Sequence, residues 1–370
     1  MFQVVYFTAI FPFVVLIILF IFGLTLPGAA NGIHYYLTPD FKKLAEVNVW
    51  IDAATQIFFS LSVSCGGLMT LSSYNKFSNN CHRDALIIPV INCATSFFAG
   101  FVIFAILGFM AEKTGKDIEE LVSSGSALAF IVYPEAVTNM PIPPIWSFLF
   151  FFMLLTLGMD SMLAYVETIT TTVIDHFSWY DKKHYVAIGT CTIMFLCGLP
   201  ICCNGGYYLF DLLDQVSLSW NIMVCAFLES IIVAWIYGVN NIFEDIKKMG
   251  MRIPKVFEYY WKICWSLITP GLILFLLIMN FVNHKPFSMD GYVYPDGIQV
   301  LAWIIPSSCV IIIPIVGIYQ IIVLYRKDTQ FQLYSKHIGN ALFQPSPNWS
   351  THGKSVIKED ATPSNETTGA

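Results

Sequence analysis

Charged residues are scarce in this chain. Asp, Glu, Lys and Arg make up 12% of the 370 residues, whereas a soluble domain carries roughly 25%. Hydrophobic residues make up 56%, and the mean hydropathy is +0.66. This composition excludes a soluble globular domain and indicates an integral membrane protein. The formal net charge of −6 is spread over loops and tail, and no basic patch suggests a nucleic-acid partner.

Motifs for catalysis and for metal binding are also missing. The chain has no nucleotide-binding loop and no catalytic triad, and its ten cysteines are scattered, mostly inside apolar segments. Because they lack the spacing of metal ligands or of a disulfide framework, we interpret them as small buried hydrophobic residues. The sequence therefore predicts neither an enzyme nor a bound cofactor. We also expect no cleavable signal peptide, since the first apolar run is too long and has no small-residue cleavage site.

Apolar segments of membrane-spanning length are what the chain has instead. A span needs about 20 predominantly apolar residues. The sequence predicts an all-α integral membrane protein with eight transmembrane helices. They are expected at residues 4–26, 49–73, 84–111, 145–174, 185–203, 218–238, 258–282 and 298–325.

Two regions lie outside these spans. Residues 112–144 form a long loop with Glu119, Glu120 and an apolar stretch at 127–133, which indicates short helices that dip back toward the membrane as an extracellular lid. Residues 328–370 are rich in Ser, Thr, Pro and Asn, and we expect a disordered cytosolic tail. The predicted organisation is a transmembrane domain at 1–327 followed by this tail.

Basic residues fall mainly on one side of the predicted spans. The positive-inside rule places the loops that hold most of them, and both termini, in the cytosol. The residues on that side are Lys76, Arg83, Lys182, Lys183, Lys247, Lys248, Arg252, Lys255, Arg326 and Lys327. The opposite loops hold Lys42, Lys43, Lys113, Lys116 and Lys285.

The second predicted span has a middle that does not suit an uninterrupted membrane helix. Three serines, a cysteine and two glycines occupy residues 60–67, where leucines would be expected. Irregular backbone is excluded from lipid because its polar groups would have no partners, so such a break is tolerated only where it lines a cavity. Interrupted helices mark substrate and ion sites in secondary transporters. This segment indicates transport.

Neutral polar side chains recur at helical spacing within the spans. Gln56 and Ser60 share one helix face, and Asn92 and Ser96 share another. A lone Asn or Ser in a membrane helix usually joins it to a neighbouring helix. As a group, however, these amide and hydroxyl donors could hold a small anion without a cationic side chain.

The fourth span carries a carboxylate, Asp160, deep in its interior. An ionised carboxylate there is costly unless it is paired, and the spans offer no Lys or Arg for it except Lys262, near a segment end. A bound cation is the simplest counter-charge, because small hard cations take oxygen ligands; structural pairing is the alternative. Further acidic residues lie at Glu167, Asp214 and Glu229.

Several stretches together resemble the neurotransmitter:sodium symporter family. They are WIDAATQIFFSLS at 50–62, SSYNKF at 72–77, NCATS at 92–96, YPEA at 133–136 and MLLTLGMDS at 153–161, and the similarity extends over almost the whole chain. The resemblance implies a twelve-helix fold built from two inverted five-helix repeats. The predicted spans correspond to helices five to twelve of that fold, so we expect a chain that lacks the first four helices and about half of the binding site.

The resemblance also implies roles for individual residues. Ser60 and Asn92 resemble ligands of a first sodium site, and Leu157 (by its carbonyl), Asp160 and Ser161 those of a second. The residues that resemble a chloride site are Gln56, Ser60, Asn92 and Ser96, and those that resemble the substrate-pocket wall are Phe59, Ser62, Cys65, Ser161 and Tyr165. Asp214 and Asp175 resemble the acidic halves of the outer and inner gates, whose arginines would come from the missing helices. Glu229 matches a family carboxylate and receives no role.

Within the family, Ser60, Ser62, Gly66–Gly67 and LAFIVYPE at 128–135 look most like the glycine, proline and broad-spectrum amino-acid branch. This implies symport of a neutral, glycine-like amino acid with sodium and chloride across the plasma membrane, by alternating access. Cys65 stands where a bulky aromatic residue is usual, which argues against strict selectivity for glycine. The alternative is a truncated, non-transporting isoform or fragment that associates with a full-length carrier. A channel is less favoured because the polar groups cluster at one depth, and a homo-oligomer is left open.

Overall fold

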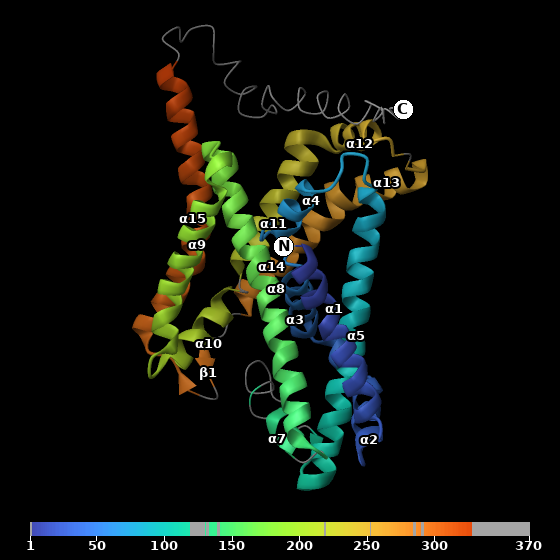
Figure 1. The fold of residues 1–370 in the computed structure, drawn as a ribbon. Coiled ribbons are helices and arrows are strands. Elements are labelled where there is room, and N and C mark those ends of the chain that lie inside the picture. Colours follow the sequence, from blue (N-terminus) through green and yellow to red (C-terminus); the bar gives the residue numbers. More distant parts are fainter. Residues whose placement is uncertain are drawn as a thin grey trace, which may run out of the picture. The chain divides into compact units, whose positions relative to one another are not determined.

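The computed structural model describes residues 2–118, 130, 133–138, 141–217, 220–251, 253–283, 286–289 and 292–327, and these are almost entirely helical (Figure 1). Two compact units divide the chain. Met1–Val47 and His82–Phe195 form the first, and Asn48–Cys81 and Leu196–Ala370 form the second. The tail predicted at 328–370 lies outside the described residues. So do Glu119, Glu120 and most of the apolar stretch at 127–133.

Seven helices of the described chain are long and apolar enough to cross a membrane, which confirms the prediction of an all-α membrane protein at this level. One of them, Gly206–Lys248, runs across residues 218 and 219, which are not described. The segment predicted at 49–73 is not among the seven because it is divided into two short helices. The other six are Tyr6–Gly23, Cys81–Thr114, Pro143–Phe177, Tyr180–Cys202, Lys255–Val282 and Asp296–Val323.

The first unit is built on α1 (Phe2–Gly23), which packs along α8 (Pro143–Phe177) (Figure 1). Their apolar side chains meet those of α5 (Cys81–Thr114) and α7 (Tyr133–Thr138) in one core that includes Val15, Val102 and Phe150. The unit also contains α2 (Ala29–Leu37), η1 (Lys43–Ala45), η3 (Tyr180–Lys182) and most of α9 (Lys183–Gly198).

Helices α2 and α5 approach each other closely because glycines face each other there. A Cβ atom on Gly32 would lie 1.8 Å from the carbonyl oxygen of Phe104, and one on Gly108 would lie 2.5 Å from that of Gly28. Only glycine lacks the Cβ that these positions exclude. The glycines therefore fix how α2 lies against the longer helix.

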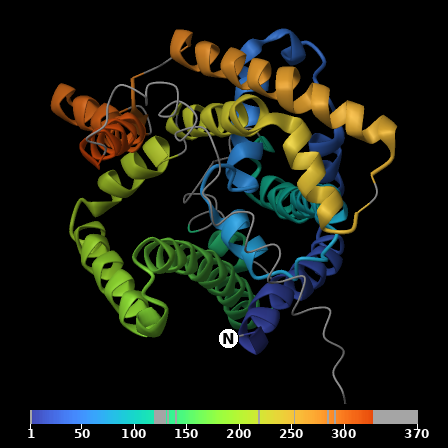
Figure 2. The same cartoon turned by 90° about the horizontal axis from the view of Figure 1, so that it is seen from above.

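The second unit pairs α11 (Trp220–Ile231) with α14 (Thr269–Val282), which lie side by side (Figure 2). Ile51, Met223 and Ile273 belong to the core between its helices. Two π-helical segments, η5 (Ile232–Gly238) and η6 (Cys264–Ile268), run next to each other, and Trp235 Nε1 donates to the carbonyl oxygen of Ser266 at 3.1 Å. The remaining elements are α3 (Val47–Ser60), α4 (Gly67–Ser73), η4 (Leu199–Cys202), α10 (Gly206–Ser217), α12 (Val239–Lys248), α13 (Lys255–Ile263), β1 (Ser288–Met289), β2 (Tyr292–Val293) and α15 (Asp296–Lys327).

Candidate functional site

The helix break predicted in the second span is confirmed. Helix α3 ends at Ser60, α4 begins at Gly67, and the residues between them form turns. Ser62, Ser64 and Gly66 have φ angles of 50°, 61° and 76°, in the left-handed region. Glycine adopts this conformation freely, but a serine does so at a cost of roughly 1 kcal/mol or more. The surrounding structure must therefore hold the two serines in place.

One such restraint comes from Glu229, a carboxylate for which the family resemblance implies no role. Ser64 Oγ donates a hydrogen bond to Glu229 Oε2 at 3.0 Å, which joins the break to the last turn of α11. Both side chains are half-buried. The carboxylate thus has a polar partner within the second unit, as a membrane-embedded acid requires. The sequence alone identified both residues but not their contact.

The carboxylate of Asp160 also has a partner on another helix. The hydroxyl of Thr8 on α1, only 4% exposed, donates to Asp160 Oδ1 on α8. Ser161 Oγ donates to the carbonyl oxygen of Leu157 one turn earlier, at 3.3 Å. The three residues expected to form the second sodium site therefore lie on adjacent turns of one helix, with Thr8 beside them. Sequence reasoning missed Thr8, although it is a short hydroxyl side chain within an otherwise apolar span.

Residues expected at the other ion sites come from both units. Gln56 and Ser60 lie one turn apart on α3 in the second unit. Asn92 and Ser96 lie one turn apart on α5 in the first unit. Each pair lies within one continuous helix, so its two side chains share a face as predicted. Their meeting in one sodium site and one chloride site stays a prediction.

The residues expected to line the substrate pocket also come from both units. Phe59 is at the end of α3, and Ser62 and Cys65 are in the turns of the break. Ser161 and Tyr165 follow each other on α8, one turn apart. The break thus contains irregular backbone and small side chains, and α8 carries a hydroxyl and an aromatic ring. Their meeting in one substrate pocket stays a prediction.

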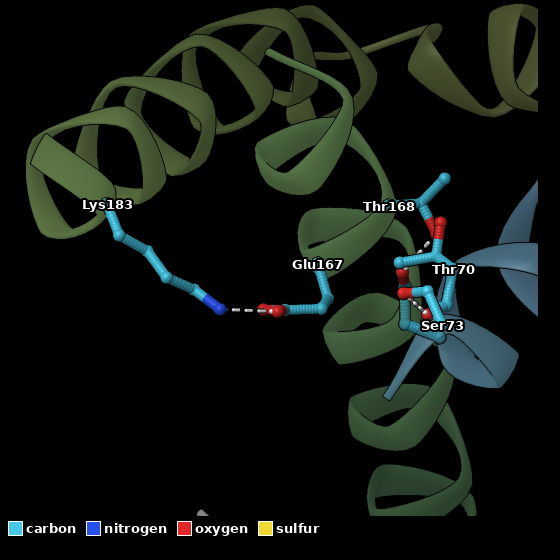
Figure 3. A network of polar contacts seen from close by, with 6 residues as sticks. Thr70, Ser73, Glu167, Thr168 and Lys183 are labelled. Carbon is cyan, nitrogen blue, oxygen red and sulfur yellow. Dashed lines mark hydrogen bonds and ion pairs between the residues drawn. The ribbon is translucent and has the colours of Figure 1, made fainter. Parts of the chain in front are cut away.

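The acidic residues expected at the gates lie at helix ends. Asp214 is exposed near the end of α10, and Asp175 is exposed in the last turn of α8. Glu167 lies between Asp160 and Asp175 along α8. Lys183 Nζ donates a hydrogen bond to Glu167 Oε1 at 2.6 Å, and the two side chains form an ion pair (Figure 3). Lys183 begins α9, so this pair joins two consecutive helices. Sequence reasoning noted Glu167 but not its partner.

The chain shares extended similarity with known proteins. The model of the sodium:neurotransmitter symporter family matches residues 2–324. A sodium- and chloride-dependent neutral and basic amino acid transporter B(0+) of Homo sapiens is 46% identical over 355 residues, which cover 95% of this chain and 54% of the relative. A sodium- and chloride-dependent glycine transporter 1 of Xenopus laevis is 44% identical over 350 residues (94% and 54%). A sodium-dependent dopamine transporter of Caenorhabditis elegans is 45% identical over 323 residues (86% and 52%). The chain spans about half the length of the curated relatives it matches.

Proposed function

Because the chain belongs to the sodium:neurotransmitter symporter family, we propose that it serves sodium- and chloride-coupled symport of amino acids across the plasma membrane. The observation that carries this proposal is the helix break at residues 61–66 inside a membrane-length segment. A break frees backbone carbonyl and N–H groups, which become ligands for ions and for the charged ends of an amino acid. Since the relatives are named as transporters, membership also favours transport over catalysis.

The second sodium site is proposed at the carbonyl of Leu157 and the side chains of Asp160 and Ser161. Sodium would supply the positive charge that an intramembrane carboxylate needs, with oxygen ligands of the kind that hard cations prefer. The hydrogen bond from Thr8 supports this proposal because it orients one oxygen of Asp160. Ser60 and Asn92 are proposed for the first sodium site.

The chloride site is proposed at Gln56, Ser60, Asn92 and Ser96, whose amide and hydroxyl hydrogens can hold an anion without a cationic side chain. The substrate wall is proposed at the break and on α8. Its members are Phe59, Ser62, Cys65, Ser161 and Tyr165. Relatives named for glycine and for neutral and basic amino acids support a neutral, glycine-like amino acid as the substrate.

The arrangement of the proposed carrier follows the family fold. Its transporter domain, at residues 1–327, would have eight spans that correspond to helices five to twelve of the family fold. The carrier would also have an outer lid at 112–144 and a cytosolic tail at 328–370, with both termini in the cytosol. We propose Asp214 for the outer gate and Asp175 for the inner gate. The proposal includes no oligomeric state. Alternating access would then require that sodium and substrate bind the two end states with different affinities.

Uptake of labelled amino acids tests the proposal. Cells that express the gene encoding this chain should take up a neutral amino acid when sodium and chloride are present, and uptake should fall to background when sodium is replaced. Asp160→Asn should abolish sodium-dependent uptake at unchanged surface expression. Asp181→Asn, which alters an exposed carboxylate in η3, is the matched control. Uptake that is insensitive to sodium or to Asp160→Asn would overturn the proposal.

A further inference from the structure

The connection between α14 and α15 contains a hairpin that is too small to be stable alone. Strands β1 and β2 pair in antiparallel register, with Ser288 opposite Val293 and Met289 opposite Tyr292. Even a complete isolated hairpin is at best marginally stable in water. The position of this hairpin must therefore be set by contacts with the helices around it.

Gln299, on the first turn of α15, provides one of these contacts. Its Nε2 donates to the carbonyl oxygens of Phe287 at 2.8 Å and Tyr294 at 3.3 Å, and its Oε1 accepts from the Phe287 N–H at 3.1 Å. One amide side chain thus satisfies backbone groups on both arms of the hairpin. The hairpin is thereby attached to the start of α15.

A second set of contacts joins the hairpin to α10. The hydroxyl of Tyr294, a side chain only 3% exposed, lies 3.0 Å from Asp211 Oδ2 and 3.1 Å from the carbonyl oxygen of Tyr208. Gln215 Nε2 donates to the same Asp211 oxygen at 2.7 Å and to the carbonyl oxygen of Ser288 at 3.0 Å. Asp211 and Gln215 are one turn apart on α10 and present one face to the hairpin.

Apolar packing surrounds these polar contacts. Leu212 and Val216 of α10 pack with the ring of Tyr294 and with Ala302 of α15 in a separate core cluster. Burial, and then the hydrogen bond to Asp211, raise the pKa of Tyr294 to about 12. The hydroxyl therefore keeps its proton, and its role as a donor, at every physiological pH.

We propose that Asp211, Gln215 and Tyr294 form a latch that keeps α10, the hairpin and the start of α15 moving as one body. The latch would thereby position Asp214, which follows Asp211 by one turn on α10. The inference rests on the proposed function, in which Asp214 serves the outer gate. Any tilt of α10 must carry the hairpin with it or break hydrogen bonds around a buried tyrosine. Asp211, Gln215 and Tyr294 are thus positioning residues for the gate.

Hydrogen–deuterium exchange tests the latch without relying on transport. In Tyr294→Phe the ring stays in the core and only the hydroxyl is lost, so amides at 286–289 and 208–215 should exchange about tenfold faster. Amides of α8 should not change. Asp211→Ala, which removes both acceptor oxygens, should give a similar result. The effect of the double variant should fall short of the sum of the two single effects, because both changes break the contact between Tyr294 and Asp211. Tyr185→Phe, which removes a hydroxyl from a side chain that is 77% exposed on α9, is the control.

Uptake kinetics then test the positioning of the gate. Tyr294→Phe should raise the KM for the amino acid several-fold and change kcat less, while the control variant should leave both unchanged. Faster exchange with an unchanged KM would overturn the positioning role and leave a purely structural contact. Unchanged exchange in both single variants would overturn the latch itself. If no variant and no wild-type protein transports amino acids, the proposed function fails, and the exchange data still decide the latch.

Discussion

The hydroxyl of Thr8 on α1 donates a hydrogen bond to Oδ1 of Asp160 on α8, and the two residues are 152 positions apart in the chain. The contact lies between α1 and α8, the two helices of the first unit that pack most extensively on each other. A buried donor limits the rotamers of the carboxylate that we propose for the second sodium site. The geometry of that site therefore depends on a residue outside the predicted ligand set.

Thr8→Val should weaken sodium binding. The substitution keeps the shape of the side chain but removes the donor, and a hydrogen bond to a charged group contributes about 1.5–3 kcal/mol. We expect the sodium concentration for half-maximal uptake to rise about tenfold or more. Thr8→Ser keeps the hydroxyl and should stay close to wild type. An unchanged sodium dependence in Thr8→Val would show that the hydroxyl does not position Asp160.

Two substitutions of Ser64 should differ in a defined order. Ser64→Ala loses the hydrogen bond to Glu229 and keeps a strained left-handed φ of 61°, so we expect a loss of roughly 1–3 kcal/mol. Ser64→Gly loses the same bond but relieves about 1 kcal/mol of backbone strain. The Tm of the purified protein in detergent should therefore be lowest for Ser64→Ala. The opposite order would mean that the backbone at this position is not strained.

Reversing one charge of the Glu167–Lys183 pair should destabilise the contact between α8 and α9. The side chains are 17% and 45% exposed, so losing the attraction alone through Lys183→Gln should cost less than about 1 kcal/mol. Lys183→Glu should cost more because two carboxylates would face each other. Combining it with Glu167→Lys should restore the Tm. A double variant that is as unstable as Lys183→Glu would indicate that the charges do not interact.

Gly32→Ala should prevent α2 from packing on α5. The added Cβ would lie 1.8 Å from a backbone carbonyl oxygen, which cannot rotate away, and overpacking of this kind costs about 1–3 kcal/mol or more. The expected result is a clear loss of Tm in detergent. Gly189→Ala on α9 is the control, because its Cβ would meet no atom within 4 Å. Equal Tm values for the two variants would contradict the close approach of the helices.

Titration should show that Tyr294 ionises later than an ordinary tyrosine. Its pKa is raised from 10.0 to about 12, mainly by burial. Since the pKa in the folded state exceeds that in the unfolded state, the stabilisation is complete below about pH 10 and is lost between pH 10 and 12. Tyrosinate absorbance, compared between wild type and Tyr294→Phe, measures this step. Ionisation of Tyr294 near pH 10 would show that the ring is not buried.

The sequence predicted the membrane class and the helix break because both depend on local composition. A run of about 20 apolar residues must form a helix in lipid, and glycines and serines at 60–67 cannot continue it with the same stability. For the span expected at 49–73, the sequence predicts an interruption but not its backbone geometry. Hydropathy measures the length of an apolar segment and does not register the left-handed turns that divide it into α3 and α4.

By itself, the sequence determined which segments are long enough to cross a membrane, where polar residues interrupt them and to which family the chain belongs. Only the tertiary structure decided the partners of those polar residues. Thr8 meets Asp160, Ser64 meets Glu229 across 165 positions, and Tyr294 meets Asp211 across 83. The physical reason is that helical periodicity orients a side chain on its own helix, while the packing of apolar surfaces decides which distant helix it faces.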